Sequence, residues 1–347
     1  MDKIHFLKTE KLAGTFISFI ILIGVSFYSL VVFWPLPKLE KPVRVKIVKG
    51  ETVSMIASQL EDKKVIEMTQ PFILATQMMG YDKSIKTGMK DIYEAKTYFG
   101  LINKLVHGTP VYHKITIREG FNLDELAKIL EDNLGVSTEI FLKICQNNTK
   151  IEELNLEVNS LEGFLYPETY YLEYEEDPET IVYKMTEQFV KNFDSSMIKR
   201  TEQMGLTIPE VVTLASIIQG EAIYDSERVI ISAVFHNRLS RRMKLEADPT
   251  IQYIVDGPPR RLLYKDLKID SPFNTYLYHG LPPGPINSPD KESLLAALYP
   301  AEVDYLYFVA NGNGYHTFSK TNAEHLKAKK EFQKVRRMRQ QKKETNG

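Results

Sequence analysis

TIPEVVTLASIIQGE, residues 207–221, is the stretch that most constrains the fold. It opens as a capping box, because Thr207 can accept a hydrogen bond from the backbone of Glu210 and Glu210 can return one. The proline in its first turn sits where a missing N–H costs little. Apolar residues then recur three and four positions apart. The stretch therefore predicts a helix that packs an apolar face into a core.

Glu221 ends this predicted helix on its apolar stripe, four and three residues after Ile217 and Ile218. Its carboxyl group should point toward the core, and burial disfavours the charged form of a carboxyl group. A raised pKa is what a general acid needs to protonate a glycosidic oxygen near neutral pH. The alternative is a carboxylate that reaches solvent or pairs with an arginine such as Arg228.

The N-terminal region predicts a membrane span. No charged residue occurs from Leu12 to Trp34, a run that reaches about 34 Å as a helix. Its bulky end differs from the small-residue cleavage site of a signal peptide. We expect a cytoplasmic tail (1–11), a transmembrane helix (12–34) and a proline-rich linker (35–42). Lysines flank the span on both sides, so the short tail, rather than charge, favours export of the rest of the chain.

An internal repeat follows the predicted linker. GETVSMIASQLED at residues 50–62 recurs as GFNLDELAKILED at residues 120–132. Each copy follows a β-branched run, and Thr52 or Asn122 can cap the helix that starts there. This pattern predicts two strand-turn-helix units, at 43–113 and 114–160, although two ordinary amphipathic helices with similar caps remain an alternative. The first copy resembles a LysM module, a small βααβ fold that binds N-acetylglucosamine-containing chains.

Composition and motifs exclude several function classes. Lys and Arg number 44 against 45 Asp and Glu, so no global charge steers the chain to nucleic acid. Cys145 is the single cysteine and lies among apolar residues, which predicts a buried thiol and no disulfide. Residues 311–314 lack the lysine of a phosphate loop and predict a hairpin turn. His316, Glu324 and His325 do not form a metal-binding motif, so we expect neither a metal nor a cofactor.

Further motifs follow the helix in a fixed order. They are Glu227-Arg228, Val234 to Leu239, Asp248-Pro249-Thr250, Ser271 to Tyr276, Gly280 to Ile286, Tyr307 to Ala310 and His316 to Ser319, with Leu161 to Gly163 and Tyr166 to Tyr170 before it. Together they resemble the YceG-like family of endolytic murein transglycosylases, over essentially the whole chain.

The resemblance implies an α+β protein with a membrane helix, a LysM-like subdomain, a catalytic domain at 161–330 and a basic tail at 331–347. It implies that Glu221 catalyses cleavage of the bond between N-acetylmuramic acid and N-acetylglucosamine in nascent peptidoglycan and that 1,6-anhydro ends form. The enzyme would thereby limit the length of the strands. The resemblance also implies an inner-membrane enzyme that works beside penicillin-binding synthases. The residues expected to contact or orient sugar are Glu162, Asn237, Asn274, Thr275 and Tyr276.

Two positions depart from the family pattern, and two other functions stay open. Gln219 stands where the family commonly has a glutamate, and Glu246 where it usually has a glutamine. The first alternative is a non-catalytic, membrane-tethered scaffold that binds peptidoglycan. The second is an aminodeoxychorismate lyase, which would need pyridoxal phosphate and a marked lysine, and the membrane helix argues against it.

Overall fold

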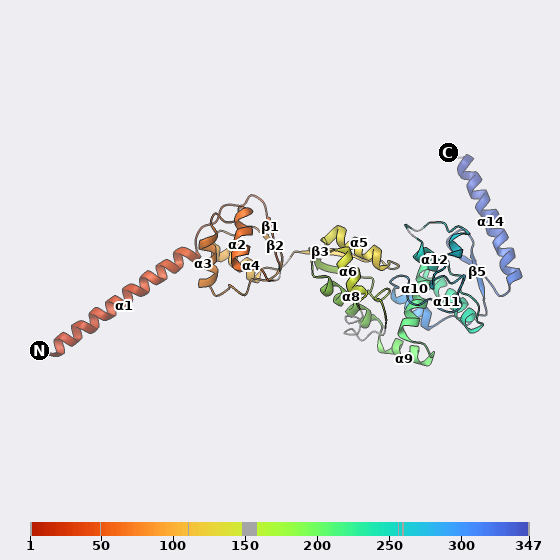
Figure 1. Cartoon of the computed structure of the whole chain (residues 1–347), viewed down its shortest axis with the longest axis horizontal. Helices are drawn as coiled ribbons and strands as arrows, with labels where there is room; N and C mark the ends of the chain where they lie inside the picture. The colour runs from red at the N-terminus through yellow and green to blue at the C-terminus, as the bar shows by residue number, and fades with distance from the viewer. Residues whose placement is uncertain are drawn as a thin grey trace. The chain divides into compact units, whose positions relative to one another are not determined.

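The computed structural model describes residues 2–48, 50–109, 111–147, 158–255, 257–258 and 260–345 (Figure 1). It confirms a mixed α+β chain, and its described part contains three two-stranded sheets. The chain divides into a first unit, residues 1–113 with 171–176, and a second unit, residues 114–170 with 177–347. The end of the predicted 114–160 unit includes residues 148–157, which lie outside the described residues.

The N-terminal helix α1 (Asp2–Val32) contains a stretch, Thr15–Val32, that is long and apolar enough to cross a membrane. It is the one helix among the described residues that passes this test. The helix ends at Val32 and not at Trp34 as the sequence suggested. Its last two residues, Val31 and Val32, are 7% and 0% exposed and belong to the core of the first unit.

The first unit runs β1 (Val43–Ile47), α2 (Val53–Asp62), α3 (Thr69–Met78), β2 (Gly88–Ile92) and α4 (Tyr98–His107). Strands β1 and β2 pair antiparallel, with Val43 opposite Ile92 and Ile47 opposite Gly88. Thr52 caps α2 as predicted, since its hydroxyl accepts from the N–H of Met55. The order β1, α2, α3, β2 is therefore a βααβ unit, to which α4 and the end of α1 add core residues.

Part of the predicted linker is packed on the first unit. Pro35 forms an isolated bridge with Thr97, and the N–H of Leu36 donates to the carbonyl of Lys96 at 2.9 Å. The carbonyl of Trp34 accepts from the N–H of Tyr98 at 3.1 Å. The chain from α1 into the first unit thus runs along the start of α4.

Strands β3 (Tyr112–Thr116) and β4 (Thr169–Glu173) pair with each other, and each has residues in both units. The second unit then contains α5 (Leu123–Leu134), α6 (Thr138–Cys145) and α8 (Pro178–Asn192). Asn122 and Glu125 form a capping box at the start of α5, after Gly120, whose φ is +80°. A left-handed turn of this kind favours glycine. Cys145 is buried, as predicted.

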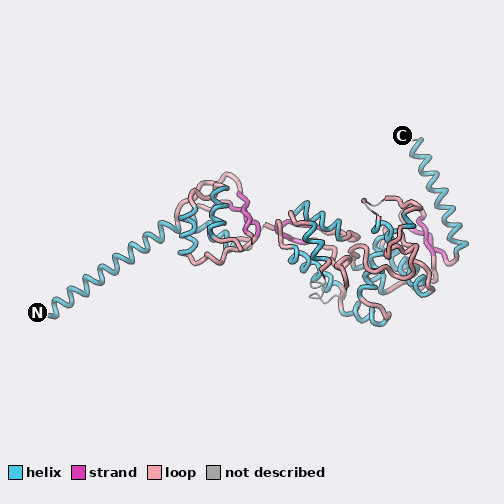
Figure 2. The backbone as a smooth tube through the Cα atoms, in the orientation of Figure 1, coloured by secondary structure: helices cyan, strands magenta, loops and turns pink. Residues whose placement is uncertain are grey.

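Helices dominate the rest of the second unit (Figure 2). They are α9 (Ser195–Gln203), α10 (Ile208–Glu221), α11 (Asp225–Ser240), α12 (Asp248–Ile254), η1 (Asp266–Lys268), α13 (Lys291–Leu298) and α14 (Asn322–Thr345). Between α13 and α14, β5 (Tyr307–Ala310) and β6 (His316–Ser319) form an antiparallel hairpin, which confirms the turn predicted at residues 311–314.

Helix α10 is the central element of this region. The predicted capping box of Thr207 and Glu210 is present, and residues 211–218 are all buried. The helix packs against α9, α11, α12 and α13. It therefore has no single apolar stripe: protein surrounds it until its last residues, where Gly220 and Glu221 reach the edge of the core.

Gly220 allows α10 and α12 to approach closely. A Cβ atom at this position would lie 2.6 Å from Cβ and 2.9 Å from Cγ of Pro249, near the start of α12. These distances are shorter than van der Waals contact, so any side chain here would push α12 away from α10.

Replacing Gly220 by Ala should lower the free energy of unfolding of the second unit by about 1–3 kcal/mol, because overpacking forces the two helices apart. The measurement is thermal or chemical unfolding of the full chain. The control is Gly100→Ala in α4, where an added Cβ would meet no atom closer than 3.8 Å. This control should be neutral or stabilise its helix by up to about 1 kcal/mol. Equal stability of the two variants would contradict the close approach.

Candidate functional site

Two hollows in the second unit meet at Glu221. The first hollow, of about 390 Å³, is lined by Glu221 and Asp248 together with residues from the start of α5, from α12 and from the loop at Ile286 and Asn287. The second hollow, of about 460 Å³, is also lined by Glu221 and Asp248, with residues of α11, β5, β6 and α14 around them. A long ligand that occupied both hollows would pass Glu221 at its middle.

Glu221 is a partly buried carboxyl group at the last residue of α10. Burial, followed by the negative charge of Asp248, raises its pKa to about 8. The backbone N–H of Asp248 donates to the carboxyl group and Arg238 lies within its field, and both act in the opposite direction. The predicted direction of the pKa shift is confirmed, and the group is mostly protonated near neutral pH.

Arg228, the alternative partner considered for Glu221, is engaged elsewhere. Its guanidinium forms ion pairs with Asp290 and, at 3.1 Å, with Asp225. It also donates to Oε1 of Gln219 at 3.2 Å, and that same oxygen accepts from the hydroxyl of Ser293 at 2.9 Å. Gln219 therefore ties the end of α10 to the start of α13. Glu221 is the carboxyl group of α10 that lines the hollows.

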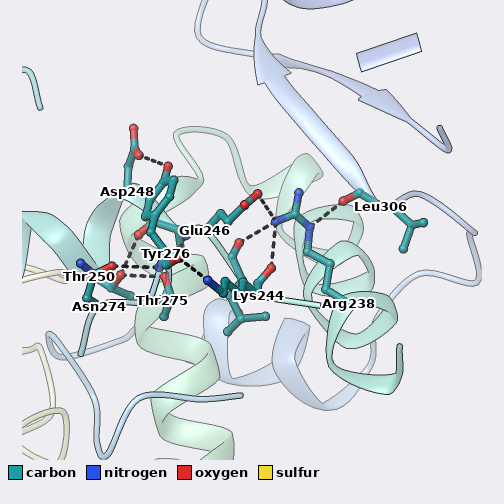
Figure 3. A network of polar contacts seen from close by, with 11 residues as sticks. Arg238, Lys244, Glu246, Asp248, Thr250, Asn274, Thr275, Tyr276 and Leu306 are labelled. Carbon is teal, nitrogen blue, oxygen red and sulfur yellow. Dashed lines mark hydrogen bonds and ion pairs between the residues drawn. The ribbon is translucent and has the colours of Figure 1, made fainter. Parts of the chain in front are cut away.

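Asp248 is held in place by the segment 274–276, which carries three of the five predicted sugar-contacting residues (Figure 3). The hydroxyl of Tyr276 donates to Oδ1 of Asp248 at 2.6 Å. One residue before Asp248, the N–H of Ala247 donates to the hydroxyl of Thr275 at 3.0 Å, and the hydroxyls of Thr250 and Thr275 are 2.9 Å apart. These bonds fix the start of α12 beside Glu221.

Arg238 fixes the other side of the same segment (Figure 3). It is 7% exposed, and its Nε donates to the carbonyl of Leu306 at 2.7 Å. Its Nη1 donates to the carbonyls of Lys244 and Leu245 and, at 3.2 Å, to the carboxylate of Glu246. Glu246, where the sequence analysis noted a departure from the family pattern, has a φ of +48°. Its ion pair with Arg238 holds it in this conformation.

The first hollow contains a buried hydrogen-bond acceptor. Asn287 is 7% exposed, and its Nδ2 donates to the carbonyl of Ser216 on α10 at 3.0 Å. Its Oδ1 is buried and has no hydrogen-bond partner within the described residues. Tyr253 lines the same hollow, and its hydroxyl donates to Oε2 of Glu162 at 3.3 Å. The first hollow is thus lined by a fixed asparagine side chain and a fixed aromatic ring.

The second hollow contains an oriented histidine. The backbone N–H of His316 and its Nδ1 both contact the Glu227 carboxylate at 2.9 Å, and its ring packs edge-on against Phe308. His325 in the same hollow stacks on Tyr307 at 5.2 Å between ring centroids. Among the described residues no three His, Cys, Asp or Glu side chains lie close enough to hold a metal ion.

The structure brings some of the predicted sugar-contacting residues to the hollows and not others. Of the five, all of which are described, Tyr276 alone lines a hollow with Glu221. Asn237 donates to the carbonyls of Val303 and Tyr305, and Asn274 donates to two carbonyls of its own loop. Thr275 orients Ala247 and Thr250.

Glu162, the fifth of these residues, is buried behind the wall of the first hollow. It accepts from the N–H of Leu123 at the start of α5, at 3.2 Å to Oε1, and from Tyr253. Burial raises its pKa to about 8. Asn287 and Tyr253, by contrast, line the hollow and were not singled out from the sequence, because the contacts that orient them come from distant positions.

Comparison with known proteins places this site in a family. A sequence profile of the YceG-like family matches residues 45–331. An endolytic murein transglycosylase of Bacillus subtilis (strain 168) is 33% identical over 336 residues, which are 90% of this chain and 91% of that protein. One of the same name from Streptococcus pneumoniae serotype 2 (strain D39) is 27% identical over 84% of this chain, which spans only 59% of that relative.

Solved structures give the same result. The crystal structure of a YceG-like protein from Listeria monocytogenes superposes with a TM-score of 0.58 at 32% sequence identity, over 83% of this chain and 99% of that one. The sequence match alone covers more than half of the chain, including Glu221 and every residue that lines the two hollows except Phe332. The chain therefore belongs to the YceG-like family.

Proposed function

We propose that this chain is an endolytic lytic transglycosylase of peptidoglycan, with Glu221 as its acid and base. The observation that carries the proposal is the position of Glu221, a carboxyl group with a pKa of about 8 at the meeting point of two hollows. The relatives in Bacillus and Streptococcus that are named endolytic murein transglycosylases supply the substrate class. No feature of the site favours a non-catalytic scaffold.

In the proposed reaction, protonated Glu221 donates its proton to the oxygen that links N-acetylmuramic acid to N-acetylglucosamine. The bond from that oxygen to the anomeric carbon breaks, and the 6-hydroxyl of the muramic residue attacks the same carbon. The Glu221 carboxylate then accepts the proton of that hydroxyl, so no net water is consumed and a 1,6-anhydro end forms. A tethered internal nucleophile has a high effective concentration, which removes the need for an activated water.

Asp248 supports this chemistry in two ways. Its negative charge raises the pKa of Glu221 and so keeps the acid protonated. The same charge, held by Tyr276 at 2.6 Å, would favour the positive charge that develops at the anomeric carbon. Tyr276 would then contact the sugar near the bond that breaks, while Thr275, Asn274 and Asn237 position the surrounding loops.

The hollows suit a chain of N-acetylated sugars. Asn287 lines the first hollow, where its side chain is held by the Ser216 carbonyl and could contact an N-acetylated sugar. Tyr253 offers an aromatic ring, and Glu162 holds that ring through its hydroxyl. Because hollows lie on both sides of Glu221, sugars could extend in both directions, as cutting inside a strand requires.

The location of the enzyme follows from α1. We propose that α1 stays in the inner membrane and that the rest of the chain lies on the extracytoplasmic side, where peptidoglycan is found. Cleavage after α1 would remove Val31 and Val32 from the core of the first unit, which argues for an anchor over a signal sequence.

The βααβ unit within 43–113 would be a LysM-like glycan-binding subdomain, the region 114–160 a second strand-turn-helix unit and residues 161–330 the catalytic domain. Penicillin-binding synthases are the proposed partners.

Mass spectrometry of the products from purified peptidoglycan tests the reaction. The wild-type chain should release fragments with 1,6-anhydro-muramoyl ends, and Glu221→Gln should reduce their release by about 10²–10⁴-fold or more, because the amide cannot deliver a proton. Glu187→Gln, an exposed position on α8, is the matched control and should keep full activity. Reducing ends from the wild type would replace the mechanism with hydrolysis. Substantial activity of a stable Glu221→Gln chain would remove Glu221 from it.

The pH dependence of the reaction tests the electrostatic role of Asp248. Since the acid must be protonated, kcat/KM should fall as pH rises through the pKa of Glu221, about 8. Asp248→Asn removes a charge that raises this pKa, so the fall should begin at lower pH. Asp270→Asn, an exposed carboxylate that accepts from Tyr278, should leave the profile unchanged. An unshifted profile in Asp248→Asn would show that burial alone sets the pKa.

A further inference from the structure

The end of α1 is part of the first unit, with no free linker between them. Val31 and Val32 are buried in the core of that unit, and α1 packs against α3 and α4. The carbonyl of Trp34 then accepts from Tyr98 at the start of α4. A membrane that contains α1 would therefore reach the surface of this unit directly.

The length of α1 makes this contact close. The uncharged part of α1 runs from Leu12 to the end of the helix at Val32 and has 21 residues. At about 1.5 Å for each residue it reaches roughly 32 Å, while the hydrocarbon core of a bilayer is about 30 Å thick. The span has few apolar residues to spare. Val32 would thus lie at the edge of the hydrocarbon layer, although it is also inside the first unit.

The surface around this point carries exposed aromatic rings. Phe33 and Phe99 are 53% and 43% exposed, and their rings stack with centroids 5.3 Å apart. Tyr93 is 40% exposed. Single exposed apolar residues are ordinary on protein surfaces. These three rings are not scattered singly. Phe33 directly follows α1, Phe99 stacks on it, and Tyr93 belongs to the segment 93–97 that is bonded to residues 35 and 36.

A shallow hollow continues the same face. It measures about 650 Å³ and lies between residues 36–39 and residues 93–96. The two segments run side by side, joined at Pro35 and Thr97 and by the hydrogen bond from Leu36 to Lys96. Leu36, Pro37, Leu39 and Ala95 give it apolar walls, and three exposed charged residues, Lys38, Lys96 and Glu94, also line it, so lysines outnumber the acidic residue.

We propose that the first unit lies on the phospholipid bilayer through this face, which comprises Phe33, residues 36–39, residues 93–96 and Phe99. Tyr93 would lie at the membrane–water interface, where the amphipathic rings of Tyr and Trp are enriched. Phe33 and Phe99 would enter the boundary between headgroups and acyl chains, as the apolar side chains of interfacial segments do. Lys38 and Lys96 would meet the phosphates of the headgroups. This inference rests on the proposed membrane anchor and adds that the unit itself touches lipid, which would hold it in one orientation.

Fluorescence quenching by lipid tests the contact, because Trp34 is the single tryptophan of the chain. The full chain is reconstituted into vesicles of phosphatidylcholine and phosphatidylglycerol, with or without bromine on the acyl chains. Two single-tryptophan proteins are compared, Trp34→Phe with Phe99→Trp, and Trp34→Phe with Met55→Trp. Phe99 and Met55 are both exposed, so both proteins should fold, which thermal unfolding checks.

The tryptophan introduced at position 99 should be quenched several-fold more strongly than the one introduced at position 55 on α2. Equal, weak quenching of both would overturn the contact. The unaltered chain tests the membrane anchor separately from the lipid-contacting face, since Trp34 must be quenched if α1 is inserted. Quenching of Trp34 without quenching at position 99 leaves the anchor and rejects the face, whereas no quenching of Trp34 rejects both.

Discussion

The complete burial of α10 is the constraint on which the candidate site depends. Residues 211–218 are enclosed by neighbouring helices on all sides, so the helix cannot rotate or shift without opening the core. Its final residue must then emerge at one place. Ser216, inside this buried stretch, uses its hydroxyl and carbonyl to hold the loop at Ile286 and Asn287, so the same helix positions both Glu221 and the floor beside it.

The polar segment around Asp248 depends on this helix in turn. Gly220 admits Pro249 to close contact, and the pair of threonine hydroxyls at positions 250 and 275 secures the start of α12. Burial of Glu221, followed by the charge of Asp248, raises the pKa of Glu221. Both causes follow from the close packing of the end of α10 against the start of α12.

Local sequence signals predicted the features that depend on neighbours in the chain. The caps at Thr52, Asn122 and Thr207, the turn between β5 and β6 and the direction of the Glu221 pKa shift follow from such signals. The partners of Asn237, by contrast, lie more than sixty positions away, and so does the Ser216 carbonyl that orients Asn287. No periodicity encodes such pairs. Likewise, the uncharged run extended the predicted helix to Trp34, since the absence of charge cannot register that Val31 and Val32 belong to the core of the first unit.

The three crossings between the units affect how the chain can fold during synthesis. The first unit comprises residues up to 113 and also residues 171–176, with the whole of residues 114–170 between them. Within it, Lys46 of β1 pairs with Glu175 and Glu173 lies against Gly88. A chain that emerges from its N-terminus cannot complete these contacts until Glu176 has been made. The unit nearest the N-terminus therefore finishes folding only after a long segment of its neighbour has appeared, and contacts of such wide separation form slowly.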